Sequence, residues 1–217
     1  MTQAEIIKKT KEFVMKTLEK DGTGHDWWHI ERVLNNSIYI AKKEKADLFI
    51  VQLGALLHDI ADFKFHGGDD KAGGRVTRKW LEGLSLDEKN IADVCYIVDN
   101  VSFKGLGVKN MMRGLEGRIV QDADRLDGLG AIGIARAFAY GGHKNRPLYN
   151  PFGKAKKHKT FSSYKKGADS TIHHFYEKLL HIKKLMNTKT GRKLAEGRHK
   201  IMEEYLKNFF SEWKGVQ

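Results

Sequence analysis

Proline is scarce in this chain, and that scarcity constrains the fold more than any other feature. Among the 217 residues there are two prolines, Pro147 and Pro151. Because proline ends or kinks a helix, the long proline-free stretches on either side can form uninterrupted helices. Most of them repeat apolar residues at three- and four-residue steps, and none shows the alternation of a strand. The sequence therefore predicts an all-α protein.

Capping residues and glycines divide the chain into its predicted helices. The first helix ends at Asp21-Gly22, and Asp26 and Asp47 are candidate N-caps for the second and third. The third helix, from Phe49 to Ile60, is apolar on most faces, which predicts a central position in the bundle. Further helices are expected near residues 70–83, 87–101, 114–126, 129–140, 169–186 and 191–213.

Length and composition favour a single domain over residues 1–217, with a core at about 20–130. The segment at about 141–167 is rich in glycine, proline and lysine, and C-terminal helices follow at about 169–214. Because a loop of this length is unusual in a compact domain, it is a candidate substrate lid. The resulting expectation is one all-α helical bundle.

The composition also bears on location and partners. No apolar run reaches the roughly 18 residues of a membrane span, and the N-terminus lacks the features of a secretory signal, which predicts a cytoplasmic protein without membrane contact. Cys95 is the single cysteine, so no internal disulfide can form, and its apolar surroundings predict a buried thiol. No heptad or apolar patch indicates a homo-oligomer, although one is possible.

Lysine and arginine outnumber aspartate and glutamate by 39 to 27, giving a formal charge of +12. Such an excess favours anionic partners through long-range attraction. The basic residues are spread along the chain and are densest in GKAKKHK at 153–159, rather than gathered into one arm. This distribution does not favour a dedicated nucleic-acid surface.

Several residues of metal-ligand type stand near the ends of apolar helices. The third predicted helix ends in ALLHDIADFKF, which contains His58 and Asp59; His29 lies in GHDWWHIERV and Asp124 in QDADRLDGLG. A histidine in such a place can simply be hydrogen-bonded to a neighbour. Buried carboxylates, however, need a cationic side chain or a metal ion. Arg125 or Arg32 could pair with one carboxylate more easily than with both Asp59 and Asp124.

Four segments in this order resemble the HD superfamily of metal-dependent phosphohydrolases: GHDWWHIERV, LLHDIADFKF, DADRLDGLGAIGIARAF and HHFYEKLL. The likeness extends over about residues 20 to 210, and it is greatest to a bacterial subgroup of about this length. It implies an HD-type helical bundle in a single domain. The ligand set that the resemblance implies is His29, His58, Asp59 and Asp124.

Two imidazoles and two carboxylates suit one octahedral divalent cation with positions left open for water or substrate. Manganese is the expected ion, with iron, cobalt, nickel or magnesium as alternatives, and the absence of thiolates argues against structural zinc. Asp62 follows Asp59 by three residues, and the resemblance implies that it orients a water or acts as general base. Lys64 could neutralise phosphate oxygens. The alternatives are a surface pair for Asp62 and a solvated side chain for Lys64.

Further residues are candidate substrate contacts. His25 lies outside the second helix if Asp26 is its N-cap, so a contact with substrate suits it better than metal ligation. Arg125 could offset phosphate charge, and His174 and Lys178 lie in the recurring HFYEKL segment of the resembling subgroup. By spacing alone, that segment is an ordinary amphipathic helix with a basic face.

The resemblance implies hydrolysis of a nucleoside or deoxynucleoside triphosphate to the monophosphate and pyrophosphate. Two alternatives stay open: a 5'-nucleotidase-type phosphomonoesterase, and a non-catalytic HD module that binds nucleotides or RNA. The chain has no Walker-type glycine loop, no G-x-S-x-G, no H-E-x-x-H and no paired C-x-x-C. These absences leave Walker-type NTPases, serine hydrolases and zinc proteins without support.

Overall fold

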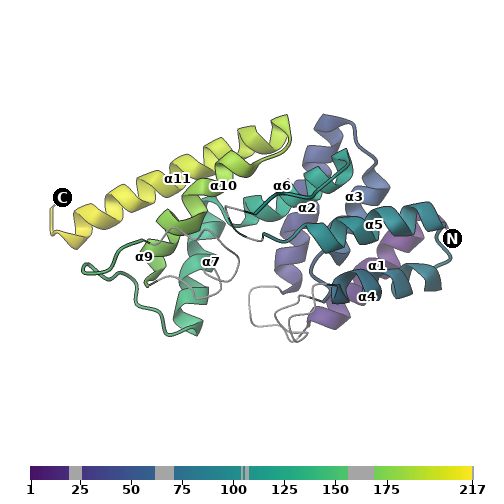
Figure 1. Ribbon diagram of the computed structural model, residues 1–217, viewed down its shortest axis with the longest axis horizontal. Helices are drawn as coiled ribbons and strands as arrows, with labels where there is room; N and C mark the ends of the chain where they lie inside the picture. The colour runs from purple at the N-terminus through teal and green to yellow at the C-terminus, as the bar shows by residue number, and fades with distance from the viewer. Residues whose placement is uncertain (20–25, 62–70, 104, 106–107, 156–168, 217) are drawn as a thin grey trace. The chain divides into compact units, whose positions relative to one another are not determined.

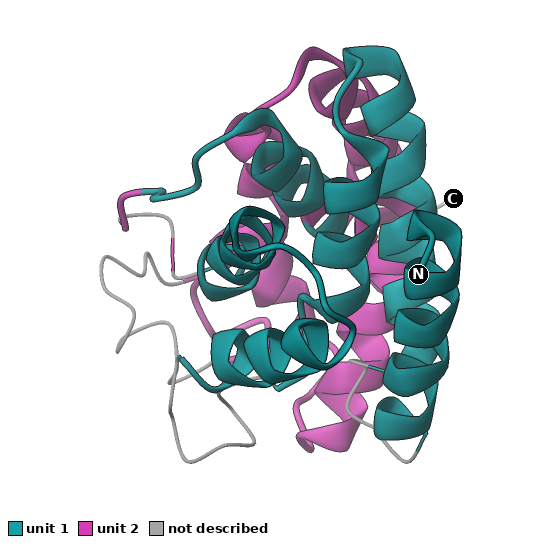
Figure 2. Ribbon diagram, turned by 90° about the vertical axis from the view of Figure 1, so that its right-hand side faces the viewer, with its two compact units in different colours: residues 1–103, 110–124 teal, residues 104–109, 125–217 magenta. Residues whose placement is uncertain are grey.

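The computed structural model describes the chain except for residues 20–25, 62–70, 104, 106–107, 156–168 and 217. The described residues form helices, turns and loops with no strand among them, which confirms the all-α prediction (Figure 1). They divide into two compact units: residues 1–103 with 110–124, and residues 104–109 with 125–217 (Figure 2). That the whole chain acts as one domain stays a prediction.

Four helices of the first unit begin at side-chain caps. Thr2 and Glu5 form a capping box at the start of α1, while Asp26, Asp47 and Asp87 cap α2, α3 and α5. The predicted caps at Asp26 and Asp47 are therefore confirmed. The helices of this unit are α1 (Gln3–Leu18), α2 (Trp27–Glu44), α3 (Leu48–Leu57), α4 (Ala72–Gly83), α5 (Glu88–Asn100) and most of α6 (Leu115–Asp127).

Helix α3 is the centre of the first unit, as its apolar sequence predicts. It packs against α1, α2 and α5. The side chains of Leu53, Leu56 and Leu57 have no solvent exposure. Full burial of one such side chain contributes about 1.5–3 kcal/mol. Polar residues, His58 and Asp59, follow directly after the C-terminal end of this helix.

The second unit contains α7 (Gly130–His143), α9 (Thr171–His174) and α11 (Lys189–Trp213), with α7 and α11 packed against each other. Residues 141–143 of the predicted lid belong to α7. The rest of its described part, residues 144–155, contacts α9 and α11 through Tyr149. The Tyr149 ring lies edge-to-face against His173, with centroids 5.7 Å apart, and against Trp213 at 5.1 Å. Residues 156–168 lie outside the described part, so a lid function stays a prediction.

Three expected helices differ from the structure. The helix predicted from Phe49 to Ile60 ends at Leu57, and residues 58–61 form turns. The predicted helix at 169–186 is broken into α9, a π-helix η1 (Phe175–Leu179), α10 (Leu180–Ile182) and a 3₁₀ turn η2 (Lys183–Leu185). Over one or two turns, apolar spacing cannot separate a π-turn from an α-turn, and the wider turn brings Glu177 inside with 5% exposure. Helix α7, expected at 129–140, continues past Gly141 to His143, and Gly141 packs closely against Thr171 instead of ending the helix.

Cys95 is half-buried, whereas the sequence predicted a fully buried thiol. Its Sγ donates to the main-chain oxygen of Gly74 at 3.5 Å. Burial raises the pKa of the Cys95 thiol to about 11. The thiol is therefore protonated at neutral pH and behaves as a small, weakly polar packing group.

Candidate metal centre

His29 lies in the first turn of α2, at a position fixed by the helix cap. The Asp26 carboxylate accepts a hydrogen bond from the main-chain N–H of His29 at 2.9 Å. Because this residue is the third of the helix, its N–H would have no partner within α2. The cap therefore orders the turn that carries the His29 imidazole, which is 1% exposed.

His58 and Asp59 follow the last residue of α3. The helix ends at Leu57, and His58 keeps helical backbone angles as the C-cap residue. His58 Nδ1 lies 2.8 Å from the main-chain oxygen of Ala55. A carbonyl oxygen can only accept, so Nδ1 carries the proton and, in the neutral imidazole, Nε2 presents a lone pair. Metal-ligating histidines are commonly oriented in this way.

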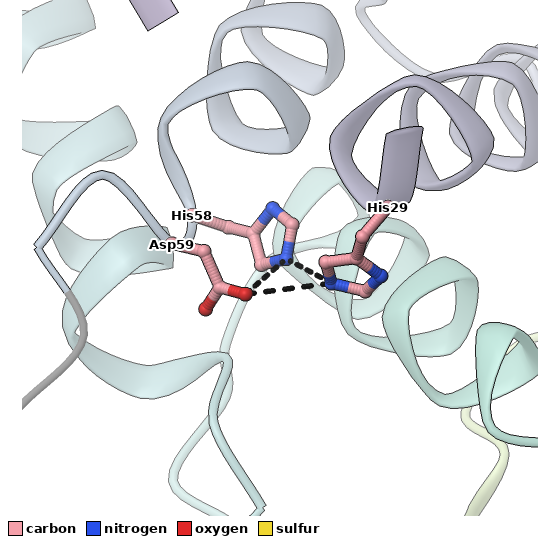
Figure 3. A group of neighbouring side chains, drawn as sticks. All are labelled: His29, His58 and Asp59. Carbon is pink, nitrogen blue, oxygen red and sulfur yellow. Dashed lines mark hydrogen bonds and ion pairs between the residues drawn. The ribbon is translucent and has the colours of Figure 1, made fainter. Parts of the chain in front are cut away.

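The side chains of His29, His58 and Asp59 converge on one point (Figure 3). The two Nε2 atoms are 3.2 Å apart, and Asp59 Oδ2 lies 3.4 Å from that of His29 and 3.5 Å from that of His58. Asp59 is 9% exposed, so this carboxylate is largely withdrawn from water. The sequence placed these residues near helix ends, and the structure brings them together.

Asp124 completes the group from a third helix. It lies in the last turn of α6, and its Oδ1 is 3.5 Å from His29 Nε2 and 3.9 Å from His58 Nε2. Its side chain is 26% exposed. The four predicted ligands are therefore grouped within the first unit, with Asp124 on the side that water can reach.

The chemistry of this group fits a divalent cation. Two atoms bound to one ion at about 2.0–2.2 Å lie at most about 4.4 Å apart. The separations that involve a histidine nitrogen run from 3.2 to 3.9 Å, and donor atoms of His29, His58 and Asp59 all lie within 4.8 Å of one another. Lone pairs of two imidazoles and two carboxylates that face each other repel unless a cation or proton lies between them. Their use as ligands stays a proposal, developed below.

The predicted substrate contacts have different surroundings. Arg125 is 9% exposed, and its Nη1 donates to the main-chain oxygen of Leu185 at 2.5 Å. This contact ties α6 to η2 within the second unit. His174 and Lys178 are half-buried at the end of α9 and within the π-helix. Asp62, Lys64 and His25 lie outside the described residues, and the roles of all six stay predictions.

Sequence reasoning missed two groups of contacts around this centre. One is the Ala55 carbonyl that fixes the His58 tautomer, and no side-chain pattern could signal it. The other is the set of arginines on the end of α6: Arg136 bound to Asp127, and Arg198 bound to the Leu126 oxygen. The segment DGLGAIGIAR runs from the last residue of α6 into α7 and contains both Asp127 and Arg136, but its glycine spacing does not give the turn that pairs them.

Comparisons with known proteins decide the family. Residues 27–129 match the model of the HD domain family. The chain is 36% identical over 217 residues to the uncharacterized protein YpgQ of Bacillus subtilis, covering all of this chain and 96% of that protein. The chain belongs to the HD superfamily of hydrolases. The residues matched by the family model include all four converging side chains.

Solved HD structures agree with this membership. A crystal structure of an HD-superfamily hydrolase from Bacillus thuringiensis is 42% identical to this HD protein, with a TM-score of 0.78, and the match covers 98% of this chain and 99% of that one. The crystal structure of Bacillus subtilis YpgQ in complex with ADP is 34% identical with a TM-score of 0.77, covering 98% and 97% of the two chains. In the described part of the chain, no helix is long and apolar enough to cross a membrane.

Proposed function

We propose that this HD protein is a metal-dependent phosphohydrolase that converts a nucleoside or deoxynucleoside triphosphate to the monophosphate and pyrophosphate. The observation that carries the proposal is the convergence of donor atoms from His29, His58 and Asp59 within the first unit, with the Asp124 carboxylate beside the two histidines. The structure of the relative YpgQ with ADP supports a nucleotide as the substrate class.

We assign the four side chains to one divalent cation, with manganese as the expected ion. Iron, cobalt, nickel and magnesium are the alternatives, since the nitrogen and oxygen donors accept each of them. When bound, the cation supplies a Lewis acid for a phosphoryl oxygen and lowers the pKa of water. The protein contributes the fixed direction of the donors: the Ala55 carbonyl holds the His58 ring, and the Asp26 cap holds the turn of His29.

The remaining chemistry is assigned to Asp62 and Lys64, which follow Asp59 closely in the sequence, and to substrate contacts elsewhere in the chain. Asp62 orients the attacking water and accepts its proton, and Lys64 offsets charge on the phosphate oxygens. His25, His174 and Lys178 are assigned to the substrate. For Arg125, the bond to the Leu185 oxygen favours a structural role alongside the proposed phosphate contact.

The charge of the second unit supports a polyanionic substrate. This unit holds 22 Lys and Arg residues against 7 Asp and Glu residues, a net charge of +15. The first unit holds 17 against 20, a net charge of −3. The formal charge of the whole chain therefore arises in the second unit. Such a field raises the rate at which an anion meets the protein, and salt weakens it.

Metal replacement followed by substrate screening tests the proposal. The metal-free protein is reloaded with manganese, cobalt, nickel or magnesium and offered nucleoside mono- and triphosphates, and the phosphate species released is identified. Pyrophosphate release from triphosphates is the expected result. Orthophosphate release from monophosphates supports the 5'-nucleotidase alternative instead. If no ion supports turnover of any nucleotide, the proposed substrate class is wrong.

The alternative of a non-catalytic module that binds nucleic acid would use the second unit, whose net charge is +15. Affinity for RNA or DNA would then fall steeply with salt, because counterions are released on binding. It would also be unaffected by Asp59→Ala. A hydrolase predicts the opposite pattern, in which Asp59→Ala removes activity and binding of long nucleic acid is weak throughout.

A further inference from the structure

The C-terminal turn of α6 carries a proposed metal ligand and has two carboxylates against one cation, Arg125. Asp124 and Asp127 both lie in this last turn. The C-terminus of a helix is the negative end of its dipole, so carboxylates there are repelled. The main-chain oxygens of this turn also have no partners within the helix. A turn of this kind needs cations or donors from outside to keep its shape.

Two arginines supply those donors. Arg136 of α7 forms an ion pair with Asp127, with Nη1 and Oδ2 2.6 Å apart, and Asp127 is 1% exposed. Arg198 of α11 donates from Nη1 to the main-chain oxygen of Leu126 at 2.6 Å. Burial lowers the pKa of Arg198, and the nearby Asp127 carboxylate acts in the opposite direction. These two contacts hold the turn through one side chain, that of Asp127, and one main-chain oxygen, that of Leu126.

The link from α6 to α7 is shaped to allow these contacts. The main-chain N–H groups of Gly128 and Leu129 donate to the oxygens of Arg125 and Leu126, each at 3.1 Å. Gly130 has a φ of +69°, and a Cβ there would lie 3.1 Å from the Cβ of Arg198. A Cβ on Gly133 would overlap the Gly128 carbonyl. The glycines of DGLGAIG therefore bring α7 and the stem of Arg198 against the end of α6.

We infer that Arg136 and Arg198 are positioning residues for Asp124: they anchor the C-terminal turn of α6 and thereby hold the Asp124 carboxylate toward the two histidines. Asp124 precedes Asp127 by three residues, so both lie in one turn of the same helix. If the anchors are lost, this turn frays and one of the four donors is displaced. The inference rests on the proposed metal-dependent function.

Titration of the metal-free protein with Co²⁺ tests the inference, because cobalt reports its ligands through a visible absorption band. The variants are Arg136→Gln, Arg136→Lys and Arg198→Gln. The matched control is Arg78→Gln, which breaks another arginine–carboxylate contact, the pair of bonds to Glu88 at 2.9 Å in the first unit. Thermal unfolding of each metal-free protein is measured in parallel.

Arg136→Gln is expected to weaken Co²⁺ binding by about 10–100-fold, the usual effect of losing a group that orients a ligand, and to change the visible band. Arg136→Lys restores part of the affinity, because an ammonium can still pair with Asp127. Arg198→Gln is also expected to weaken Co²⁺ binding. Arg78→Gln leaves both affinity and spectrum at the wild-type values, whatever it does to thermal stability.

Wild-type affinity and spectrum in folded Arg136→Gln and Arg198→Gln proteins would overturn the inference. If Arg136→Gln does not fold, Asp127→Asn replaces it in the test, since this change removes the charge of the ion pair with almost no change of shape. Wild-type Co²⁺ affinity of Asp127→Asn would likewise overturn the inference. A wild-type protein that binds no Co²⁺ would overturn the metal centre itself. The two failures are therefore distinguishable.

Discussion

The Nε2 atoms of His29 and His58 face each other at a distance of 3.2 Å, with carboxylate oxygens of Asp59 and Asp124 beside them. The two rings come from the start of α2 and the end of α3, and their planes are inclined by 65°. Because the Nδ1 proton of His58 is committed to the Ala55 oxygen, its Nε2 lone pair points into the group. With both Nε2 lone pairs directed into the group, the geometry suits a shared cation, whereas a proton on His29 Nε2 would make the 3.2 Å contact a hydrogen bond between the rings.

Removal of a ligand and removal of the proposed base should have different effects. Asp59→Ala is expected to abolish metal retention, because it deletes a 9%-exposed carboxylate from the group. Asp62→Ala is expected to retain the metal and lose turnover by about 100-fold or more, the usual contribution of a positioned base. Metal content measured after gel filtration, together with nucleotide turnover, separates the two. Normal turnover by Asp62→Ala would show that the residue has no catalytic role.

The helix caps of α2 and α3 offer a matched comparison. Asp26→Ala and Asp47→Ala each remove a side-chain acceptor at a helix N-terminus, which costs about 0.5–2 kcal/mol of stability. Asp26 caps the N–H of His29 itself, whereas Asp47 caps the end of α3 opposite to His58. We therefore expect both variants to lose stability in urea but only Asp26→Ala to bind Co²⁺ more weakly. Equal affinities would show that the His29 turn does not depend on its cap.

Two glycines of α7 provide a test of the α6–α7 turn. A Cβ at Gly133 would overlap a main-chain carbonyl, so Gly133→Ala should cost about 1–3 kcal/mol through backbone displacement. A Cβ at Gly142, in the same helix, meets no atom within 4 Å, so Gly142→Ala should be neutral or stabilise by about 0.5–1 kcal/mol. Urea midpoints measure the difference. Similar stabilities for the two variants would mean that the turn relaxes without cost.

Local signals in the sequence were sufficient to predict most of the first unit. The caps at Asp26 and Asp47, and the apolar faces of α3, specify where the helices that carry His29 and His58 begin. That these residues and Asp124 lie together came from the resemblance to the HD superfamily, since no local pattern gives the distance between helices. The motifs shared with the HD superfamily therefore predicted the grouping of the site residues, which residue spacing alone could not predict.

The features that were not predicted depend on tertiary contacts. The π-helix at Phe175–Leu179 keeps an apolar spacing that an α-helix would also show. The ion pair between Arg136 and Asp127 requires a tight turn whose geometry is set by Gly130 and Gly133. The half-exposed state of Cys95 depends on how α4 and α5 pack, since its partner is the Gly74 oxygen.

The raised pKa of Cys95 predicts a dependence of stability on pH. The folded thiol titrates at about 11, while an unfolded thiol titrates at about 8.5. Between these values the unfolded chain loses its proton first, so the unfolded state is favoured as the pH rises. The stability contributed by the protonated thiol is therefore complete below about pH 8.5 and falls as the pH approaches 11.

Urea unfolding of the wild type and of Cys95→Ala across this range measures the effect, because other groups titrate alike in both proteins. The difference in free energy of unfolding between wild type and Cys95→Ala should decline as the pH rises. A constant difference would show that burial does not raise the pKa of the Cys95 thiol.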